Sequence, residues 1–298
     1  MNANPMDVQR SSISPFQQEK TTMRIFNLPD PVRYKNMSTD ELRDAFIVDG
    51  LFQPAQLCLN YIDLDRTVVG SAVPTTDPIP LTAPEAFRAE FFTERREVGV
   101  LNIGKPGSVR VGNQRHSLGT LEALYVGRGE NPVEFVSDDP RNPAEFYLLS
   151  YPAHAAYPTQ RIPQERATRM QAGAKETANA REILRIIAPD QVQSCQLVMG
   201  FTQLAEGSVW NTMPPHTHMR RSEVYLYFDV MPEERVVHLM GPADETRHLV
   251  LANKQAVVSP GWSIHAGVGT RNYKFCWGMG GENQVYTDMD GIAVSDLR

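Results

Sequence analysis

Short apolar runs separated by Pro- and Gly-containing turns dominate the first half of the chain. Such runs occupy residues 57–62, 67–73, 98–103, 108–111, 123–126 and 146–149. Short β-type runs at this spacing predict an all-β sandwich or barrel. The same pattern resumes near residue 194 and continues to about residue 285. We therefore expect an all-β fold with two strand-rich parts.

One short helix is expected before these strands. Ser38 and Glu41 form a capping-box pattern, in which each side chain can bond the backbone N–H of the other residue. Leu42 and Phe46 then lie on one apolar side, and we expect Gly50 to close the helix.

The composition along the chain suggests boundaries between units. Polar, Pro-punctuated residues 1–36 are expected to form an arm or a poorly ordered leader. Pro-, Gln- and Arg-rich residues 152–180 indicate a linker, and residues 181–188 fit either a helix or a strand. The expected units are an arm with the short helix (1–50), a first β lobe (51–160), a linker (161–190) and a second β lobe (191–298).

The densest group of chemically active residues begins at His216. His216 and His218 are two of only seven histidines, and in an extended segment they point to the same face. Glu223 follows, and His265, after a Pro-Gly turn, would complete a set of three histidines and one glutamate. Imidazole and carboxylate ligands suit zinc, iron, manganese or nickel. We expect these four residues to bind a metal; the alternative is a chance His-x-His pair on a surface strand.

An internal repeat relates the two strand-rich parts. Residues 95–100 resemble residues 221–226, and aligning Glu97 with Glu223 gives an offset of 126 (223 − 97). Glu90 and Phe92 would then occupy the positions of the two histidines of the His-x-His motif. The first half is thus expected to be a second copy of the module without metal ligands, and a repeat of two β modules favours two barrel-like lobes.

Composition and charge exclude several partners. The net charge is −6, from 29 Lys+Arg against 35 Asp+Glu, without a basic run, so nucleic acid is not expected as a partner. No apolar run is long enough for a membrane helix, and residues 1–20 lack the apolar core of a signal peptide, so we expect a cytoplasmic protein. Three widely spaced cysteines fit a reducing compartment without a disulfide framework.

The metal-ligand spacing resembles the two motifs of the cupin superfamily. The first motif matches His216, His218 and Glu223, and the second matches the Pro-Gly turn that precedes His265. The second motif departs from the usual pattern, because Gly261 lies four residues before the histidine instead of three. These motifs alone imply a metal-binding jelly roll and leave the function open.

Several further segments resemble the 5-dehydro-4-deoxyuronate isomerase family, also called 4-deoxy-L-threo-5-hexosulose-uronate ketol-isomerase. They are residues 91–97, 101–104, 123–127, 195–200, 210–214, 245–248 and 280–285. The resemblance implies a bicupin fold of two jelly-roll barrels and one Zn²⁺ per chain on His216, His218, Glu223 and His265. It also implies a homohexamer and the conversion of 5-dehydro-4-deoxy-D-glucuronate to 3-deoxy-D-glycero-2,5-hexodiulosonate in pectin and uronate breakdown.

Such a substrate carries a carboxylate, for which an arginine clamp is expected. Arg220 and Arg221 lie beside the ligands, and Arg247 lies in one of the family-like segments. Asn211, just before the ligands, is expected to line the pocket. The alternatives are surface or interstrand salt bridges for the arginines and core packing around Asn211.

Moving a carbonyl to the adjacent carbon requires a proton to leave carbon, and therefore an acid or base. Glu282, in the segment Gly-Gly-Glu-Asn-Gln, is one candidate. Tyr225 is another, because it shares strand parity with Glu223. A turn carboxylate and a core tyrosine are the structural alternatives, and the identity of the base stays open.

Three other functions remain open at this stage. The first is an isomerase acting on 5-deoxy-glucuronate in inositol breakdown, which shares the fold. The second is a non-haem iron dioxygenase, which uses the same ligands with a redox-active metal. The third is a cupin that binds a sugar acid without catalysis.

Overall fold

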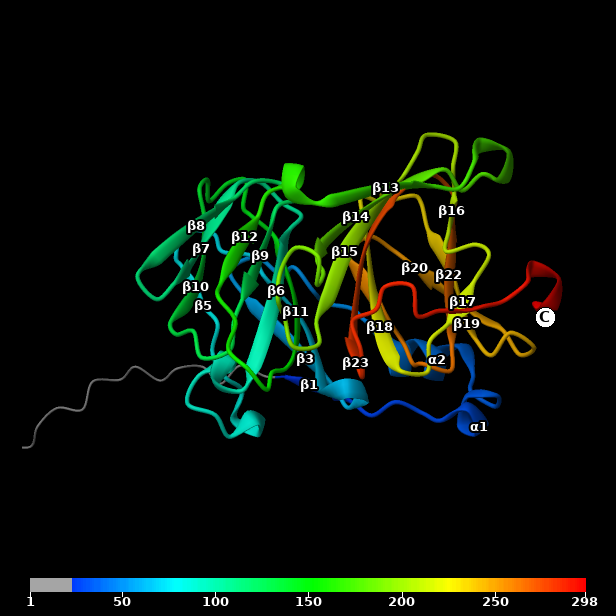
Figure 1. The fold of residues 1–298 in the computed structure, drawn as a ribbon, viewed down its shortest axis with the longest axis horizontal. Coiled ribbons are helices and arrows are strands. Elements are labelled where there is room, and N and C mark those ends of the chain that lie inside the picture. The colour runs from blue at the N-terminus through cyan, green and yellow to red at the C-terminus, as the bar shows by residue number, and fades with distance from the viewer. Residues whose placement is uncertain (1–22) are drawn as a thin grey trace, which may run out of the picture.

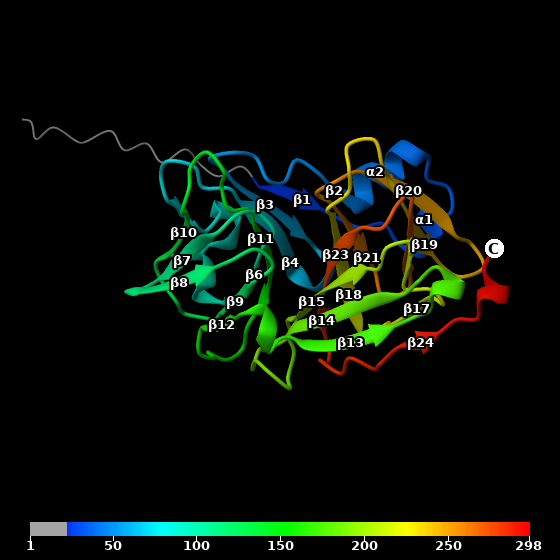
Figure 2. The ribbon, with the colours of Figure 1, turned by 90° about the horizontal axis from the view of Figure 1, so that it is seen from above.

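The computed structural model describes residues 23–298 and has two β lobes side by side (Figure 1, Figure 2). Most of the expected N-terminal arm, residues 1–22, lies outside the described residues. The all-β, two-barrel expectation is confirmed, because each lobe consists of one seven-stranded and one four-stranded sheet. In each lobe the two sheets enclose an apolar cluster, as in a jelly roll.

Six of the eleven strands of the first lobe lie where the apolar runs predicted them, and the other five were not predicted. Its large sheet has the order β1 (Arg24–Phe26), β3 (Leu57–Ile62), β4 (Thr67–Ala72), β11 (Phe146–Pro152), β6 (Arg96–Asn102), β9 (Ala123–Val126) and β12 (Gln160–Ile162). Its small sheet has the order β5 (Ile79–Pro80), β10 (Val133–Ser137), β7 (Gly107–Val111) and β8 (Gln114–Leu118). All neighbouring strands are antiparallel except β1 and β3.

The second lobe repeats this strand order. Its large sheet has the order β13 (Thr168–Ala172), β14 (Arg181–Ile187), β15 (Val198–Leu204), β23 (Lys274–Gly281), β18 (Arg221–Phe228), β21 (Gln255–Ser259) and β2 (Ile47–Val48). Its small sheet has the order β16 (Trp210–Asn211), β22 (Ile264–Gly269), β19 (Val236–Gly241) and β20 (Arg247–Leu251). A further pair joins β17 (His216–Thr217) to β24 (Asp290–Gly291).

Two short α-helices lie between β1 and β3 in sequence but pack against the second lobe (Figure 1). They are α1 (Pro31–Tyr34) and α2 (Thr39–Phe46), and α2 has the predicted capping box of Ser38 and Glu41. The chain leaves α2 directly into β2, which pairs with β21, so the helix ends before Gly50. Neither helix is long and apolar enough to cross a membrane, and the described chain contains no other α-helix.

The predicted linker is wrong for most of its length. Residues 161–190 contain β13 and β14, which form one side of the second lobe's large sheet. The strand alternative for residues 181–188 is therefore the correct one. Polar residues dominate β13 because it is an edge strand, where one side of the backbone has no neighbour and side chains reach solvent. Composition alone made this edge strand look like a connection.

The expected register of the internal repeat is wrong by one residue. Arg96 and Arg221 each begin the equivalent strands β6 and β18, and both are buried, which gives an offset of 125 (221 − 96). Glu97 faces the other lobe, whereas Glu223 faces into its own barrel. Because side chains alternate along a strand, these two glutamates cannot be equivalent, and Val98 occupies the place of Glu223.

The corrected register also moves the counterparts of the His-x-His motif. They are Phe91 and Thr93, instead of Glu90 and Phe92. Within residues 23–298, the first lobe has no counterpart of the His and Glu group found in the second. All three cysteines are free, as expected.

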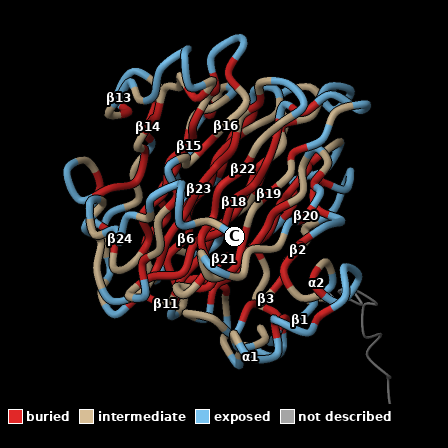
Figure 3. The backbone as a smooth tube through the Cα atoms, turned by 90° about the vertical axis from the view of Figure 1, so that its right-hand side faces the viewer, coloured by how far each residue is buried: buried red, intermediate tan, exposed pale blue. Residues whose placement is uncertain are grey.

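Three apolar clusters hold the molecule together, and the most deeply buried backbone runs through its centre (Figure 3). Val100 belongs to the cluster inside the first barrel, and Val257 belongs to the one inside the second. Leu149 and Val224 belong to the third cluster, where the two large sheets pack face to face. A Cβ added at Gly278 would lie 2.1 Å from the Leu149 side chain, so the sheets meet closely here.

Glu97 makes a buried polar contact between the lobes. Its fully buried carboxylate accepts hydrogen bonds from the backbone N–H groups of Cys195, Gln196 and Leu197 at 2.7, 2.8 and 2.9 Å. The Tyr125 hydroxyl donates a further bond at 2.8 Å. Hydrogen bonds to a charged acceptor are stronger than neutral ones, and a buried donor without a partner is destabilising. The first lobe thereby fixes a turn of the second.

Replacing Glu97 by Ala is expected to lower the free energy of unfolding by about 3 kcal/mol, because several buried donors lose their acceptor. Urea denaturation followed by circular dichroism measures the change. The control is Glu134→Ala, whose side chain makes a 3.5 Å surface ion pair with Arg110 and should change stability by at most about 0.5 kcal/mol. Equal effects of the two substitutions would contradict the structural role of Glu97.

Candidate metal centre

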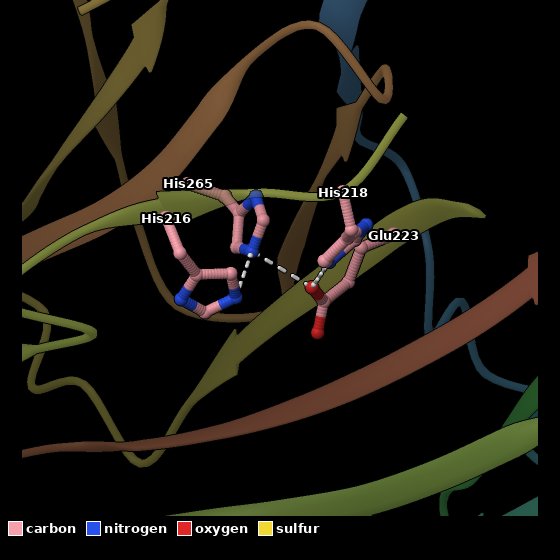
Figure 4. A group of neighbouring side chains, drawn as sticks. All are labelled: His216, His218, Glu223 and His265. Carbon is pink, nitrogen blue, oxygen red and sulfur yellow. Dashed lines mark hydrogen bonds and ion pairs between the residues drawn. The ribbon is translucent and has the colours of Figure 1, made fainter. Parts of the chain in front are cut away.

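Four predicted residues from three strands and one turn converge in the second lobe (Figure 4). His216 lies on β17, His218 follows in the next turn, Glu223 lies on β18, and His265 lies on β22. Each offers one ligand atom, and these atoms all lie within 4.8 Å of one another. His218, Glu223 and His265 are buried, and His216 is partly buried.

The separations between donor atoms fit a shared metal ion. Glu223 Oε2 lies 3.0 Å from His218 Nε2 and 2.9 Å from His265 Nε2. His265 Nε2 also lies 3.1 Å from His216 Nε2. Two ligands bound at right angles, each about 2.1 Å from an ion, would be about 3.0 Å apart. The group could therefore hold a metal ion.

The protonation and orientation of these side chains also suit a metal. The outer ring nitrogen of His218 faces the Arg221 carbonyl at 2.9 Å, and that of His265 faces the Ser263 carbonyl at 3.4 Å. Such outer hydrogen bonds direct the other nitrogen, Nε2, toward the metal. Burial lowers the pKa of His216 to about 3, so its imidazole is neutral at neutral pH, as a ligand must be.

Glu223 stays ionised in this setting. Burial alone would raise the pKa of its carboxyl group, but the charge and hydrogen bonds of the neighbouring histidines outweigh burial and lower it. The hydrogen bond and charge of Glu223 also outweigh burial at His218 and raise the pKa of that imidazole. Three imidazoles and one carboxylate are a donor set typical of a divalent ion such as zinc, which would displace the proton that His218 holds.

A cavity of about 260 Å³ opens onto three of the four residues. Its lining includes His216, His218, Glu223 and the predicted Tyr225. The Tyr225 hydroxyl lies 3.0 Å from the Thr212 hydroxyl, and its ring packs edge-on against His265. Burial raises the pKa of Tyr225 well above its usual value, so the phenol remains protonated.

Arg220 and Arg221 hold a loop instead of facing this cavity. Arg220 forms ion pairs with Asp288 at 2.6 Å and with Asp290 at 3.1 Å. The buried Arg221 donates to the backbone carbonyls of Val285 and Asp288 at 2.8 and 2.7 Å. Residues 285–290 are thereby fixed beside the metal group, and neither arginine lines the cavity.

Three further predicted residues also lie outside the cavity lining. Arg247 is on β20, where it pairs with Glu245 at 3.7 Å and donates to a carbonyl near α1. Asn211 is fully buried and donates to the Tyr273 hydroxyl at 2.7 Å, so its contacts are those of core packing. Glu282 is exposed, as expected of a carboxylate in a turn.

Sequence reasoning missed Arg181, which lines the cavity together with Ile183, two positions further along β14. Side chains two apart on a strand share a face, so an alternating pattern could have indicated it. The helix-or-strand ambiguity of residues 181–188 prevented any assignment of a face. Tyr286 and Met289, from the loop that Arg220 and Arg221 hold, also line the cavity and were not predicted.

Two duplicated jelly rolls, one with a buried group of three histidines and a glutamate, define a bicupin protein with one candidate metal centre. The KduI/IolB family model matches residues 53–293, and the chain belongs to this family.

The chain is also similar to bacterial ketol-isomerases over most of its length. It is 48% identical over 277 residues to the 4-deoxy-L-threo-5-hexosulose-uronate ketol-isomerase of Opitutus terrae, covering 93% of this chain and all of that protein. It is 51% identical over 268 residues to the protein of the same name from Burkholderia cenocepacia, covering 89% and 96% of the two chains.

Solved structures support the fold. An IolB-like protein from Salmonella typhimurium aligns with a TM-score of 0.63 at 12% identity, over 76% of this chain and 87% of that one. Oxalate decarboxylase from Bacillus subtilis aligns with a TM-score of 0.53 at 9% identity, over 74% and 70% of the two chains. At these identities the likeness concerns the two-barrel architecture.

Replacing His265 by Ala is expected to weaken metal binding by more than about 100-fold, since losing an outer-shell partner alone weakens it 10- to 100-fold. Elemental analysis of the purified, dialysed protein measures the metal content. His248→Ala is the control, because His248 is exposed on β20 and should leave the metal content unchanged. Wild-type metal content in the His265 variant would show that the ligand set is wrong.

Proposed function

We propose that this protein is a zinc-dependent ketol isomerase that converts 5-dehydro-4-deoxy-D-glucuronate to 3-deoxy-D-glycero-2,5-hexodiulosonate. Membership of the family and the curated names of its relatives make the chain an isomerase. The identity of 48% over 93% of the chain carries the choice of substrate. The buried group of three histidines and Glu223 supports a metal-assisted reaction.

The competing isomerase of inositol breakdown is less well supported. The IolB-like structure shares the fold at only 12% identity, whereas the uronate ketol-isomerases share almost half of the residues. The KduI/IolB family model covers both kinds of protein and therefore does not distinguish between the two substrates. The difference in identity favours the deoxy-ketouronate substrate.

His216, His218, Glu223 and His265 would hold the zinc ion. When bound, a divalent ion acts as a Lewis acid that stabilises negative charge on oxygen as a proton leaves the neighbouring carbon. Zinc has no redox chemistry, which suits an isomerisation without net oxidation. In that reaction carbon 2 loses a proton and carbon 1 gains one, so the aldehyde becomes an alcohol and the alcohol becomes a ketone.

Tyr225 is proposed to act on a substrate oxygen as a hydrogen-bond donor. Its phenol lies in the cavity lining, is held by the Thr212 hydroxyl, and stays protonated because burial raises its pKa. A protonated phenol can donate to an oxygen that gains charge and cannot serve as the initial base. Trp277 and Met279 add apolar walls that limit water in the cavity.

The remaining expectations extend the proposal beyond the site. The partner would be a small deoxy-ketouronate produced in pectin and uronate catabolism, without nucleic acid or membrane. The free cysteines are compatible with a cytoplasmic location. A homohexamer is proposed from the family resemblance, and light scattering after size-exclusion chromatography would measure the number of subunits.

Removing the metal is expected to abolish isomerisation, and adding zinc back should restore it. The assay incubates the protein with the unsaturated-galacturonate product of a pectin lyase digest and follows the ketose by NMR. The chelated, dialysed protein should leave the spectrum unchanged. Full activity without metal would rule out the proposed mechanism, and unchanged substrate with zinc-loaded protein would rule out the proposed substrate.

Tyr225→Phe is expected to lower kcat roughly 100-fold, because a positioned proton donor contributes at least that much to such steps. The phenol is not a proposed ligand, so the zinc content should match that of the wild type. A tyrosine far from the cavity, Tyr61→Phe in β3, is the control and should leave kcat unchanged. An unaltered kcat in the Tyr225 variant would limit this residue to packing.

A further inference from the structure

Arg181 brings an unpaired positive charge into the metal-binding cavity. It begins β14 and lines the cavity, which His216, Glu223 and Tyr225 also line. Among the described lining residues, Arg181 is the one lysine or arginine. Arg181 therefore borders the space in which a small molecule bound to the metal would lie.

The guanidinium is oriented by the backbone and is not neutralised. Its Nη1 donates to the Asn179 carbonyl at 2.8 Å, and within residues 23–298 it makes no ion pair with a carboxylate. Asn179 in turn donates to the Met213 carbonyl at 2.9 Å, just before the His-x-His motif. Burial lowers the pKa of Arg181, and the titratable groups near it are tyrosines, including Tyr225 and Tyr286.

The two arginines next to the ligands differ from Arg181 in this respect. Arg220 is paired with two aspartates, and Arg221 is bonded to two carbonyls of the same loop. A partly buried cation without an anion is unfavourable, since burial removes water that no opposite charge replaces. An incoming carboxylate would supply that charge and could bond the planar guanidinium through two oxygens.

We propose that Arg181 binds the carboxylate of the substrate and thereby sets which end of the molecule meets the metal. The inference rests on the proposed function for the identity of the substrate, but the preference for a carboxylate can be tested separately. A six-carbon sugar acid has its carboxylate at one end and its aldehyde at the other. When Arg181 binds the carboxylate, the carbonyl end of the molecule is directed toward the metal group. A neutral sugar lacks the carboxylate and therefore binds more weakly.

Binding of two commercial probes tests the preference without turnover of the proposed substrate. Titration calorimetry on zinc-loaded protein compares D-galacturonate with D-galactose, which lacks the carboxylate. The wild type is expected to bind the acid more tightly. Arg181→Gln should weaken acid binding roughly 10- to 100-fold, the range for a charged hydrogen-bonded pair, and leave galactose binding unchanged. Arg181→Lys should retain part of the preference, since lysine keeps the positive charge but cannot form two parallel hydrogen bonds to the carboxylate.

Arg169→Gln is the matched control. Arg169 lies on the neighbouring strand β13, is paired with Glu182 at 3.0 Å, and does not line the cavity, so its loss should leave both affinities unchanged. Zinc content and thermal unfolding establish whether each variant is folded. If Arg181→Gln does not fold, the Arg181→Lys variant is used for the comparison instead. A preserved acid preference in a folded Arg181→Gln variant, or no preference in the wild type, would overturn the proposal.

Kinetics separate this inference from the proposed function. With the deoxy-ketouronate as substrate, Arg181→Gln should raise KM roughly 10- to 100-fold with a smaller change in kcat, because it removes binding more than chemistry. An inactive wild type that still prefers galacturonate through Arg181 would refute the proposed reaction and support the carboxylate site. An active wild type with an unaltered KM in the variant would refute only the carboxylate site.

Discussion

The alternation of side chains along each central strand is the constraint on which the molecule depends. In β18, Glu223 and Tyr225 point into the second barrel, while Val224 and Leu226 point into the apolar layer between the lobes. Both faces of β18 are buried, so a shift of the strand could not place either set of side chains in solvent. A slip of one residue would bury Glu223 among apolar groups and remove it from the three histidines. The packing between the lobes therefore also fixes the register of the metal group.

The same constraint explains how a lobe without a metal group contributes to the site of the other. Val98 stands where Glu223 would, and Glu97, one position earlier, turns its carboxylate to the N–H groups of the 195–197 turn. Gln284 donates to the Ser194 hydroxyl at 2.7 Å and to the Leu197 carbonyl at 3.3 Å, so it holds the start of the loop that lines the cavity. A chain of hydrogen bonds thus links the first lobe to the cavity wall, and the duplicated lobe acts as a support.

Much of the fold and the four-residue group could be predicted from the sequence, because both depend on short-range patterns. The spacing of His216 and His218 predicted that both reach one site, although only His216 lies on a strand, and the apolar runs of the first lobe became strands. The hydrogen-bond and ion-pair partners of individual side chains could not be predicted. Arg220 and Arg221 lie beside the ligands in sequence, yet their guanidinium groups are used by a loop more than 60 residues further along. Edge strand β13 and the one-residue error in the repeat likewise depend on contacts between distant segments.

The distribution of positive charge around the cavity is a consequence of this architecture. The loop at 285–290 carries Asp288 and Asp290 on either side of Met289, which lines the cavity, and uncompensated negative charge there would repel a carboxylate substrate. Arg220 neutralises these aspartates, which leaves the metal group with a single acidic ligand. Arg181, the one lysine or arginine among the lining residues, comes from β14 and meets no carboxylate in the part of the chain that the structure describes. A cavity with an acidic group that could hold a metal ion and a separate basic group is polarised in a way that suits a molecule with a carbonyl at one end and an acid at the other.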